Sequence, residues 1–205
     1  MDRRRANVIE SPREPRFEDE PGLVEEVAPG KGVEIGESRL VDVDLSGAKL
    51  AGLRLTDVIV ERGNLANMVA PEISVSRAVI TGARLTGAQW TRGRLVDVLF
   101  RDCRIDLATF AGTTLERVAF SGCMLAHADF REGLLRSVRF DHCDLTEADL
   151  TGLRIDRCEL RSCTLDRLTG VERLRGAAMP WPDVLGHAGL LATALGIRVL
   201  DEDER

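Results

Sequence analysis

Large apolar residues recur at every fifth position from Leu40 to Leu165 with few lapses, and the phase of this pattern never changes. A smaller, mostly apolar residue stands two positions before each of them, as Val43 does before Leu45. A period of five belongs neither to a helix, which repeats every 3.6 residues, nor to an ordinary strand, which repeats every 2. Each unit therefore points one apolar pair inward and turns a corner with its other residues. Because such a unit cannot bury its pair alone, the pattern predicts a solenoid of stacked units.

Several units share a short motif in which an alanine and a charged residue precede Leu or Phe. The motif occurs as Ala48-Lys49-Leu50, Ala83-Arg84-Leu85, Ala128-Asp129-Phe130 and Ala148-Asp149-Leu150. With this motif the stretch from Val33 to Gly170 resembles the pentapeptide-repeat family. The resemblance implies an all-β solenoid, namely a right-handed quadrilateral β-helix with four pentapeptides per coil. About seven coils, spaced by about 4.8 Å, would form a rod about 33 Å long.

A coil of 20 residues can be tested within the sequence, since side chains 20 positions apart would then stack and should look alike. Inward positions at this spacing do match: Phe100, Phe120 and Phe140; Val98, Val118 and Val138; Cys103, Cys123, Cys143 and Cys163. These columns favour four-sided coils independently of the family resemblance. Gly63, Gly93 and Gly133 leave the small inward position empty, and Ala70 is undersized. We expect bulkier neighbours, such as Trp90 one coil above Ala70, to compensate locally.

The pattern divides the chain into three segments. Residues 1–32 are rich in proline and charge, so we expect them to be mostly disordered, with Leu23, Val24 and Val27 as a possible docking strand or turn. Residues 33–170 form the β-helix. Residues 171–205 hold a helix after Asp183 as N-cap, then a possible strand from Ile197 to Leu200 and an acidic tail. We expect this helix to cap the open end of the solenoid, because terminal repeats need a cover.

The same helix is also a candidate dimerisation element. It has more apolar surface than a cap requires, and members of the resembled family often pair through their C-terminal ends. The residues assigned to this contact are Leu190, Leu191 and Leu195.

Charge and hydropathy limit the partners and the compartment. The net charge of −6 lies in the ends of the chain, because residues 38–170 hold eighteen basic and eighteen acidic side chains. The sequence contains no apolar run of membrane-spanning length and no secretory signal, so we expect a soluble cytoplasmic protein that binds neither membrane nor nucleic acid directly.

The chemistry-bearing residues do not form a catalytic or metal site in this pattern. Cys103, Cys123, Cys143, Cys158 and Cys163 all fall on inward positions, and a line of sulfurs cannot surround a tetrahedral ion. His127 and His142 fall on outward corners and His187 in the terminal helix, with no nucleophile or carboxylate placed beside them by the repeat. A side-chain-filled solenoid also offers no natural pocket. We therefore predict a non-enzyme without cofactor or metal.

Two outward columns stand out from the mostly polar surface. One holds an apolar stripe, which is the predicted partner-binding surface: Ile59, Val79, Leu99 and Ala119. Alternatively, the segment around Leu23, Val24 and Val27 folds back and covers this stripe. The second column alternates in charge and is expected to add little stability: Asp57, Arg77, Asp97, Arg117, Ser137 and Arg157.

Three functions remain open. The first is a non-catalytic scaffold for protein–protein interaction. The second follows from the resemblance: family members that confer fluoroquinolone resistance imitate duplex DNA and bind DNA gyrase, so this chain would modulate gyrase or a related topoisomerase. That function predicts a strongly negative side of the rod, with Asp141–Asp149 as the one acidic concentration. In the third, the protein has no partner except its own second copy, and the stripe is covered.

Overall fold

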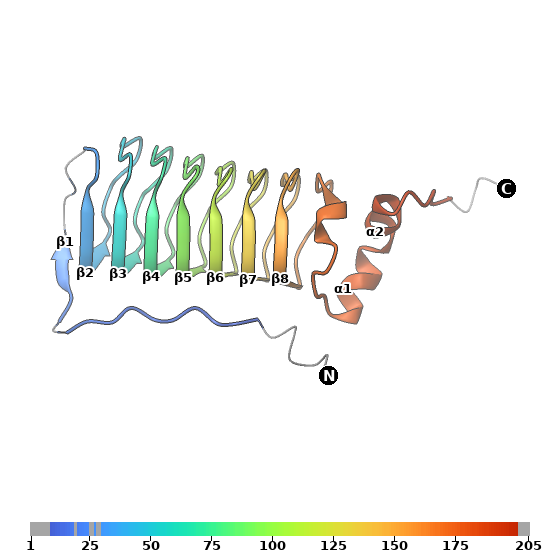
Figure 1. Ribbon diagram of the computed structural model, residues 1–205, viewed down its shortest axis with the longest axis horizontal. Helices are drawn as coiled ribbons and strands as arrows, with labels where there is room; N and C mark the ends of the chain where they lie inside the picture. The colour runs from blue at the N-terminus through green and yellow to red at the C-terminus, as the bar shows by residue number, and fades with distance from the viewer. Residues whose placement is uncertain (1–8, 19, 25–26, 28–29, 201–205) are drawn as a thin grey trace.

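The protein is an elongated solenoid built on one parallel sheet. The computed structural model describes residues 9–18, 20–24, 27 and 30–200, and the strands stack in chain order along the long axis (Figure 1). The eight strands are β1 (Gly22–Val24), β2 (Glu34–Val41), β3 (Arg54–Glu61), β4 (Ser74–Thr81), β5 (Arg94–Arg101), β6 (Thr114–Ser121), β7 (Leu134–Asp141) and β8 (Arg154–Arg161). The solenoid makes about seven turns, as predicted.

Each coil takes 20 residues. From β2 to β8 every residue in the ladder pairs with the residue 20 positions later, as Leu99 does with Ala119. The remaining sides carry isolated parallel bridges at the same spacing, such as Asn64 to Arg84. Corners between sides are made by residues with left-handed backbone conformation, including Asp97 with a φ of 57° in the middle of β5. The predicted coil length is confirmed.

The inside of the solenoid is filled by stacked aromatic columns. Phe100, Phe120 and Phe140 lie parallel, with ring centroids 4.8 and 5.0 Å apart. A second column holds Phe110 and Phe130 at 5.3 Å, and its rings meet those of the first column edge-on. All of these rings are buried, so the column prediction is confirmed. Stacking within a column and edge-to-face contact between columns are both favourable aromatic geometries.

The gaps in the apolar pattern are compensated locally. Ala70 and Trp90 are both buried, so the large ring occupies the coil above the small residue. At Gly93 the backbone lies so close to Ile73 that an added Cβ would stand 2.6 Å from the Ile73 carbonyl oxygen. One coil further on, the buried Thr113 hydroxyl donates to the Trp90 carbonyl at 2.7 Å and accepts from the Gly93 N–H at 3.1 Å. Gly93 is therefore required by the packing around it.

The C-terminal end of the solenoid is closed by a 3-10 turn and two short helices, η1 (Val171–Leu174), α1 (Trp181–Gly186) and α2 (Ala188–Ala194). Ala178 adds a partial rung, because its N–H donates to the Cys158 carbonyl at 2.8 Å and its carbonyl accepts from the Leu160 N–H at 3.0 Å. His187 Nε2 lies 2.9 Å from the Cys163 carbonyl oxygen. The predicted cap is therefore present.

The details of this cap differ from the prediction. Asp183 is not the N-cap: α1 begins at Trp181 after Pro180, and proline in the first turn is pre-set for helix. The Asp183 carboxylate instead accepts the Ser162 N–H of the last coil at 2.7 Å. The single predicted helix is divided at His187, between Gly186 and Gly189, which are weak helix formers. Residues 197–200 lie in the described part of the chain and form no strand, because Ala178 already occupies the end of the sheet at Glu159.

The N-terminal segment also differs from the prediction. Residues 1–8 lie outside the described residues, but residues 9–18, expected to be disordered, run back along one side of the rod from its β1 end (Figure 1). We name residues 9–18 the strap. The strap has little apolar surface of its own, but backbone hydrogen bonds to the solenoid hold it in place, as described below. Leu23 and Val24 fulfil the alternative of a docking strand, since β1 pairs with β2.

Replacing Gly93 by alanine tests the packing. We expect G93A to lower the free energy of unfolding by about 1–3 kcal/mol, because the Ile73 backbone must move to admit the methyl group. The unfolding midpoint in denaturant measures this change. The matched control is G189A in α2, where an added Cβ meets nothing within 4 Å; an equal loss in the control would contradict the packing argument.

Candidate protein-binding groove

The predicted apolar stripe exists as one column on one side of the rod. Ile59, Val79, Leu99 and Ala119 pair in register on consecutive strands from β3 to β6. Ion pairs flank the column at both ends, Arg39 with Glu61 at 2.8 Å and Arg139 with Glu159 at 2.9 Å. An apolar patch four strands long therefore lies between charged ends. All four apolar side chains are half-buried rather than fully exposed.

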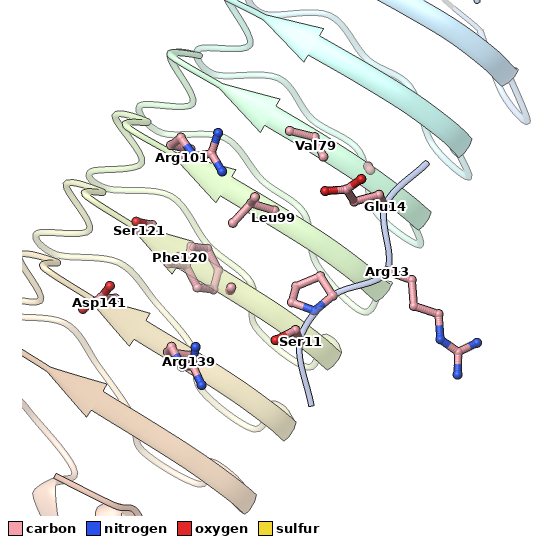
Figure 2. Close-up of a pocket in the computed structure, with 13 residues that line it drawn as sticks. Ser11, Arg13, Glu14, Val79, Leu99, Arg101, Phe120, Ser121, Arg139 and Asp141 are labelled. Atoms are coloured by element: carbon pink, nitrogen blue, oxygen red, sulfur yellow. The ribbon is translucent and has the colours of Figure 1, made fainter. Parts of the chain in front are cut away.

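The strap covers this column. Ser11, Pro12 and Glu14 line a cavity together with side chains of the sheet that include Val79, Leu99 and Ala119 (Figure 2). Further along the strap, Pro15 and Phe17 line a second cavity together with Ile59 and Val79. The alternative that the N-terminal segment covers the stripe is thus realised, but by the strap and not by the residues around Leu23, Val24 and Val27. We refer to the apolar column and the adjacent corner column as the groove.

The corner column beside the stripe is more buried than predicted. Asp57 and Asp97 are only 7% and 4% exposed, although an exposed charge ladder was expected here. Each aspartate is held by the arginine one coil above it: Arg77 Nε donates to Asp57 at 2.6 Å and Arg117 Nε donates to Asp97 at 2.7 Å. Two opposite charges one rung apart can face each other without strain, so the alternation fixes these carboxylates in position.

The strap binds to these same two carboxylates. The backbone N–H of Arg16 donates to Asp57 Oδ1 at 2.8 Å, and that of Arg13 donates to Asp97 Oδ1 at 3.2 Å. The Arg77 guanidinium holds the pKa of Asp57 below its usual value, with a further contribution from the Arg16 N–H. Burial raises the pKa of Asp97, but hydrogen bonds from Arg117 and Arg13 outweigh it and the pKa is lowered. Both groups therefore accept hydrogen bonds as carboxylates.

The C-terminal end offers a second apolar surface. Trp181 is 69% exposed and Leu195 79%, and four further large apolar residues are exposed beside them in the sequence: Leu185, Ile197, Val199 and Leu200. Of the three predicted dimerisation residues, only Leu195 is exposed. Leu190 packs against the core, and Leu191 is half-buried near Val171 and Leu174.

None of the helices in the described residues has the length and apolar character that crossing a membrane requires.

A family model described as "Pentapeptide repeat region" matches residues 94–169. These residues contain β5 to β8, and the 20-residue register continues unchanged back to β2. The chain therefore contains a pentapeptide repeat region. A comparison with curated protein sequences gives no match.

Three solved structures are similar to this chain at low identity. HetL, described as a pentapeptide repeat protein involved in heterocyst differentiation regulation from the cyanobacterium Nostoc sp. strain PCC 7120, is 17% identical, with 74% of this chain and 91% of that chain covered and a TM-score of 0.39. Full-length QnrB1, a plasmid-mediated fluoroquinolone resistance protein, is 17% identical over 82% of this chain and 96% of that chain, with a TM-score of 0.38. Rfr23 from the cyanobacterium Cyanothece 51142 is 15% identical over 66% and 90%, with a TM-score of 0.24.

The cysteine column is a packed ladder. All five cysteines are buried and free. The thiols of Cys123, Cys143 and Cys163 lie 3.5 to 3.6 Å from carbonyl oxygens of the coil below. Hydrogen bonding to the Cys103 thiol raises the pKa of Cys123 to about 12, and burial raises the pKa of Cys158 to about 12. Protonated thiols are poor metal ligands and nucleophiles. Among the described residues, no three His, Cys, Asp or Glu side chains are placed to hold a metal ion.

The histidines are placed differently from the prediction. His127 Nδ1 lies 3.3 Å from Glu147 of the next coil, and His142 Nδ1 lies 3.0 Å from Asp141. Carboxylates therefore do stand beside both rings: Glu147 because residues 20 apart stack at the corners, and Asp141 because it precedes His142 in the sequence. His127 and His142 remain exposed. His187 is half-buried and belongs to the cap described above.

Removing one carboxylate tests how the strap is held. We expect D97A to increase the rate of trypsin cleavage after Arg13 and Arg16 by about tenfold, because the strap loses a hydrogen bond to a charged group. Arg117 keeps its ion pair with Glu116 in this variant. The matched control is D42A, which removes an exposed pair with Arg62 at 2.7 Å that does not contact the strap. Equal cleavage rates in the two variants would contradict the role of Asp97.

Proposed function

We propose that this protein is a non-catalytic scaffold for protein–protein interaction. The observation that carries the proposal is the strap: this side of the rod already holds an extended peptide segment, through apolar contact and two carboxylates. The predicted partner-binding residues Ile59, Val79, Leu99 and Ala119 lie under that segment. The rigid, side-chain-filled interior supports a role in presenting surfaces rather than in catalysis.

The C-terminal end is a second candidate contact surface, and we propose that two copies of the chain meet there. Large apolar side chains exposed together usually mark a contact, and at this end they include Trp181, Leu185 and Leu195. A contact between two such ends would leave the grooves of both copies accessible. The scaffold would then present two identical binding sides at the ends of one longer rod.

The arrangement of charge favours this scaffold over a DNA mimic. A mimic of duplex DNA needs a dense and continuous negative side. Here two of the four acidic side chains of the Asp141–Asp149 region have arginine partners in neighbouring coils, since Arg131 contacts Asp149 at 3.6 Å and Arg167 pairs with Glu147. Asp42 is likewise paired with Arg62. The interaction of this protein with DNA gyrase is therefore the weaker of the two proposals.

The dimer is tested by placing a charge at the exposed C-terminal end. We expect the wild-type protein to have the mass of a dimer in light scattering after size-exclusion chromatography, and L195E to have the mass of a monomer, because a carboxylate would be desolvated in the contact. The matched control is L107E, which changes a leucine of similar exposure, 59%, on a corner of the rod. A wild-type monomer, or dissociation of L107E as well, would contradict the proposed contact.

The gyrase alternative is tested by DNA supercoiling with purified enzyme. We expect the protein at micromolar concentrations to leave the supercoiling rate unchanged, because arginines pair with two of the carboxylates in the acidic Asp141–Asp149 region. Inhibition that is abolished by charge reversal within Asp141–Asp149 would contradict this expectation and favour the mimic.

A further inference from the structure

From Ile9 to Pro15 every third residue of the strap faces the rod, and Phe17, which is also half-buried, departs from this period. Ile9, Pro12 and Pro15 are half-buried, while the residues between them are exposed. A three-residue period without internal hydrogen bonds is that of polyproline II, which has a rise of about 3.1 Å per residue. Pro12 and Pro15, spaced as Pro-x-x-Pro, favour this conformation because proline fixes φ. The burial of Ile9, Pro12 and Pro15 therefore fits a polyproline II segment over residues 9–15.

The period of the strap matches the spacing of the coils. The two donors, Arg13 and Arg16, are three residues apart, and their acceptors Asp97 and Asp57 are 40 residues apart, which is two coils. Three residues of polyproline II span about 9.3 Å. Two rungs of a parallel sheet span about 9.6 Å. The N–H groups of Arg13 and Arg16 therefore fall opposite the two aspartates of the column, which holds Ser137 two coils beyond Asp97.

The two hydrogen bonds from the strap to the aspartates come from backbone N–H groups that follow prolines, and not from the arginine side chains. Each donor N–H belongs to the residue directly after a proline, Arg13 after Pro12 and Arg16 after Pro15. The Arg13 side chain points away from the sheet (Figure 2). Any segment with two prolines three residues apart, each followed by a residue with a free N–H, can make the same contacts. Such a segment loses little conformational entropy on binding, because polyproline II is formed in advance.

The strap fills the groove incompletely. A cavity of about 280 Å³ remains between the strap and the sheet, next to Leu99 and Ala119. The ion pair nearest the N-terminal end of the strap, Glu10 with Arg157, is long at 3.6 Å and half-exposed. The two backbone hydrogen bonds are therefore the principal polar attachments of residues 9–18, and a better-fitting segment can replace them.

We propose that the groove is a docking site for an extended Pro-x-x-Pro segment of a partner protein, and that the strap is a built-in competitor that this segment displaces. The proposal rests on the scaffold function above and names the chemistry of its partner. A competitor in the same chain lowers the apparent affinity by the fraction of molecules in which the groove is open. Only segments whose backbone N–H groups match the spacing of Asp57 and Asp97 would displace the strap.

The experiment uses a fluorescent peptide with the sequence of residues 9–18 and measures its binding by anisotropy. The full-length protein is compared with the full-length variant I9D/P12E/P15E, in which the altered strap no longer fits the groove. Cleavage by trypsin after Arg13 checks that the strap is released, and thermal unfolding checks that the coils are intact. We expect the variant to bind the peptide at least about tenfold more tightly than the wild-type protein does.

Backbone methylation of the peptide provides the matched control. Methyl groups on the nitrogens at the positions of Arg13 and Arg16 remove both donors, and we expect binding to the variant to weaken at least about tenfold. One methyl group on the nitrogen at the position of Glu14, which does not face an aspartate, should leave binding unchanged. Adding D57A and D97A to the strap variant should abolish binding of the unmodified peptide.

Three results would overturn the proposal. If the released variant does not bind the peptide, the strap is a structural cover only. If methylation of the nitrogens at the positions of Arg13 and Arg16 does not weaken peptide binding, the aspartates do not bind the backbone N–H groups of the peptide. If the strap variant becomes monomeric while L195E remains a dimer, the groove receives the strap of a second copy. The scaffold function itself would survive the first two results, provided that the C-terminal contact is intact.

Discussion

Every feature of this protein depends on the constant 20-residue register between successive coils. Parallel pairing on all sides holds each residue above its counterpart in the coil before, as with Phe100 and Phe120 or Asp97 and Arg117. A single inserted residue would move all later side chains to the wrong face. The register therefore converts a short sequence motif into columns, and the columns supply both the packed interior and the surfaces.

The same register explains why the groove can bind an extended chain. Stacking places the apolar column beside Asp57 and Asp97, which lie two coils apart, so this side of the rod carries two acceptors separated by two rungs. A polyproline II segment has nearly the same interval in its backbone. Binding then needs no rearrangement of the rod, because its carboxylates are already held by Arg77 and Arg117. The C-terminal cap, by contrast, ends the ladder because it binds the free backbone groups of the last coil. The Asp183 carboxylate, for example, accepts a hydrogen bond from the Ser162 N–H.

The sequence was sufficient to predict the coil length, the inward columns and the capped end, because every coil repeats one environment and so reports it several times. Features that occur once were not predictable in this way. The alternation of Asp57, Arg77, Asp97 and Arg117 looks like a solvent-exposed ladder until another segment covers it. The strap is poor in apolar residues, which is the usual mark of disorder, and its only signal was the three-residue spacing of Pro12 and Pro15. At the C-terminus, Pro182 in the first turn and Gly186 at the last position set the limits of α1.

We expect the strap to lie in the groove of the intact protein in solution. Nuclear Overhauser effects in the isotope-labelled full-length chain measure this contact directly. The structure predicts cross-peaks between the Phe17 ring and the methyl groups of Ile59 and Val79, together with non-random shifts for residues 9–18. Random-coil shifts throughout the strap, with no cross-peaks to the stripe, would contradict the account.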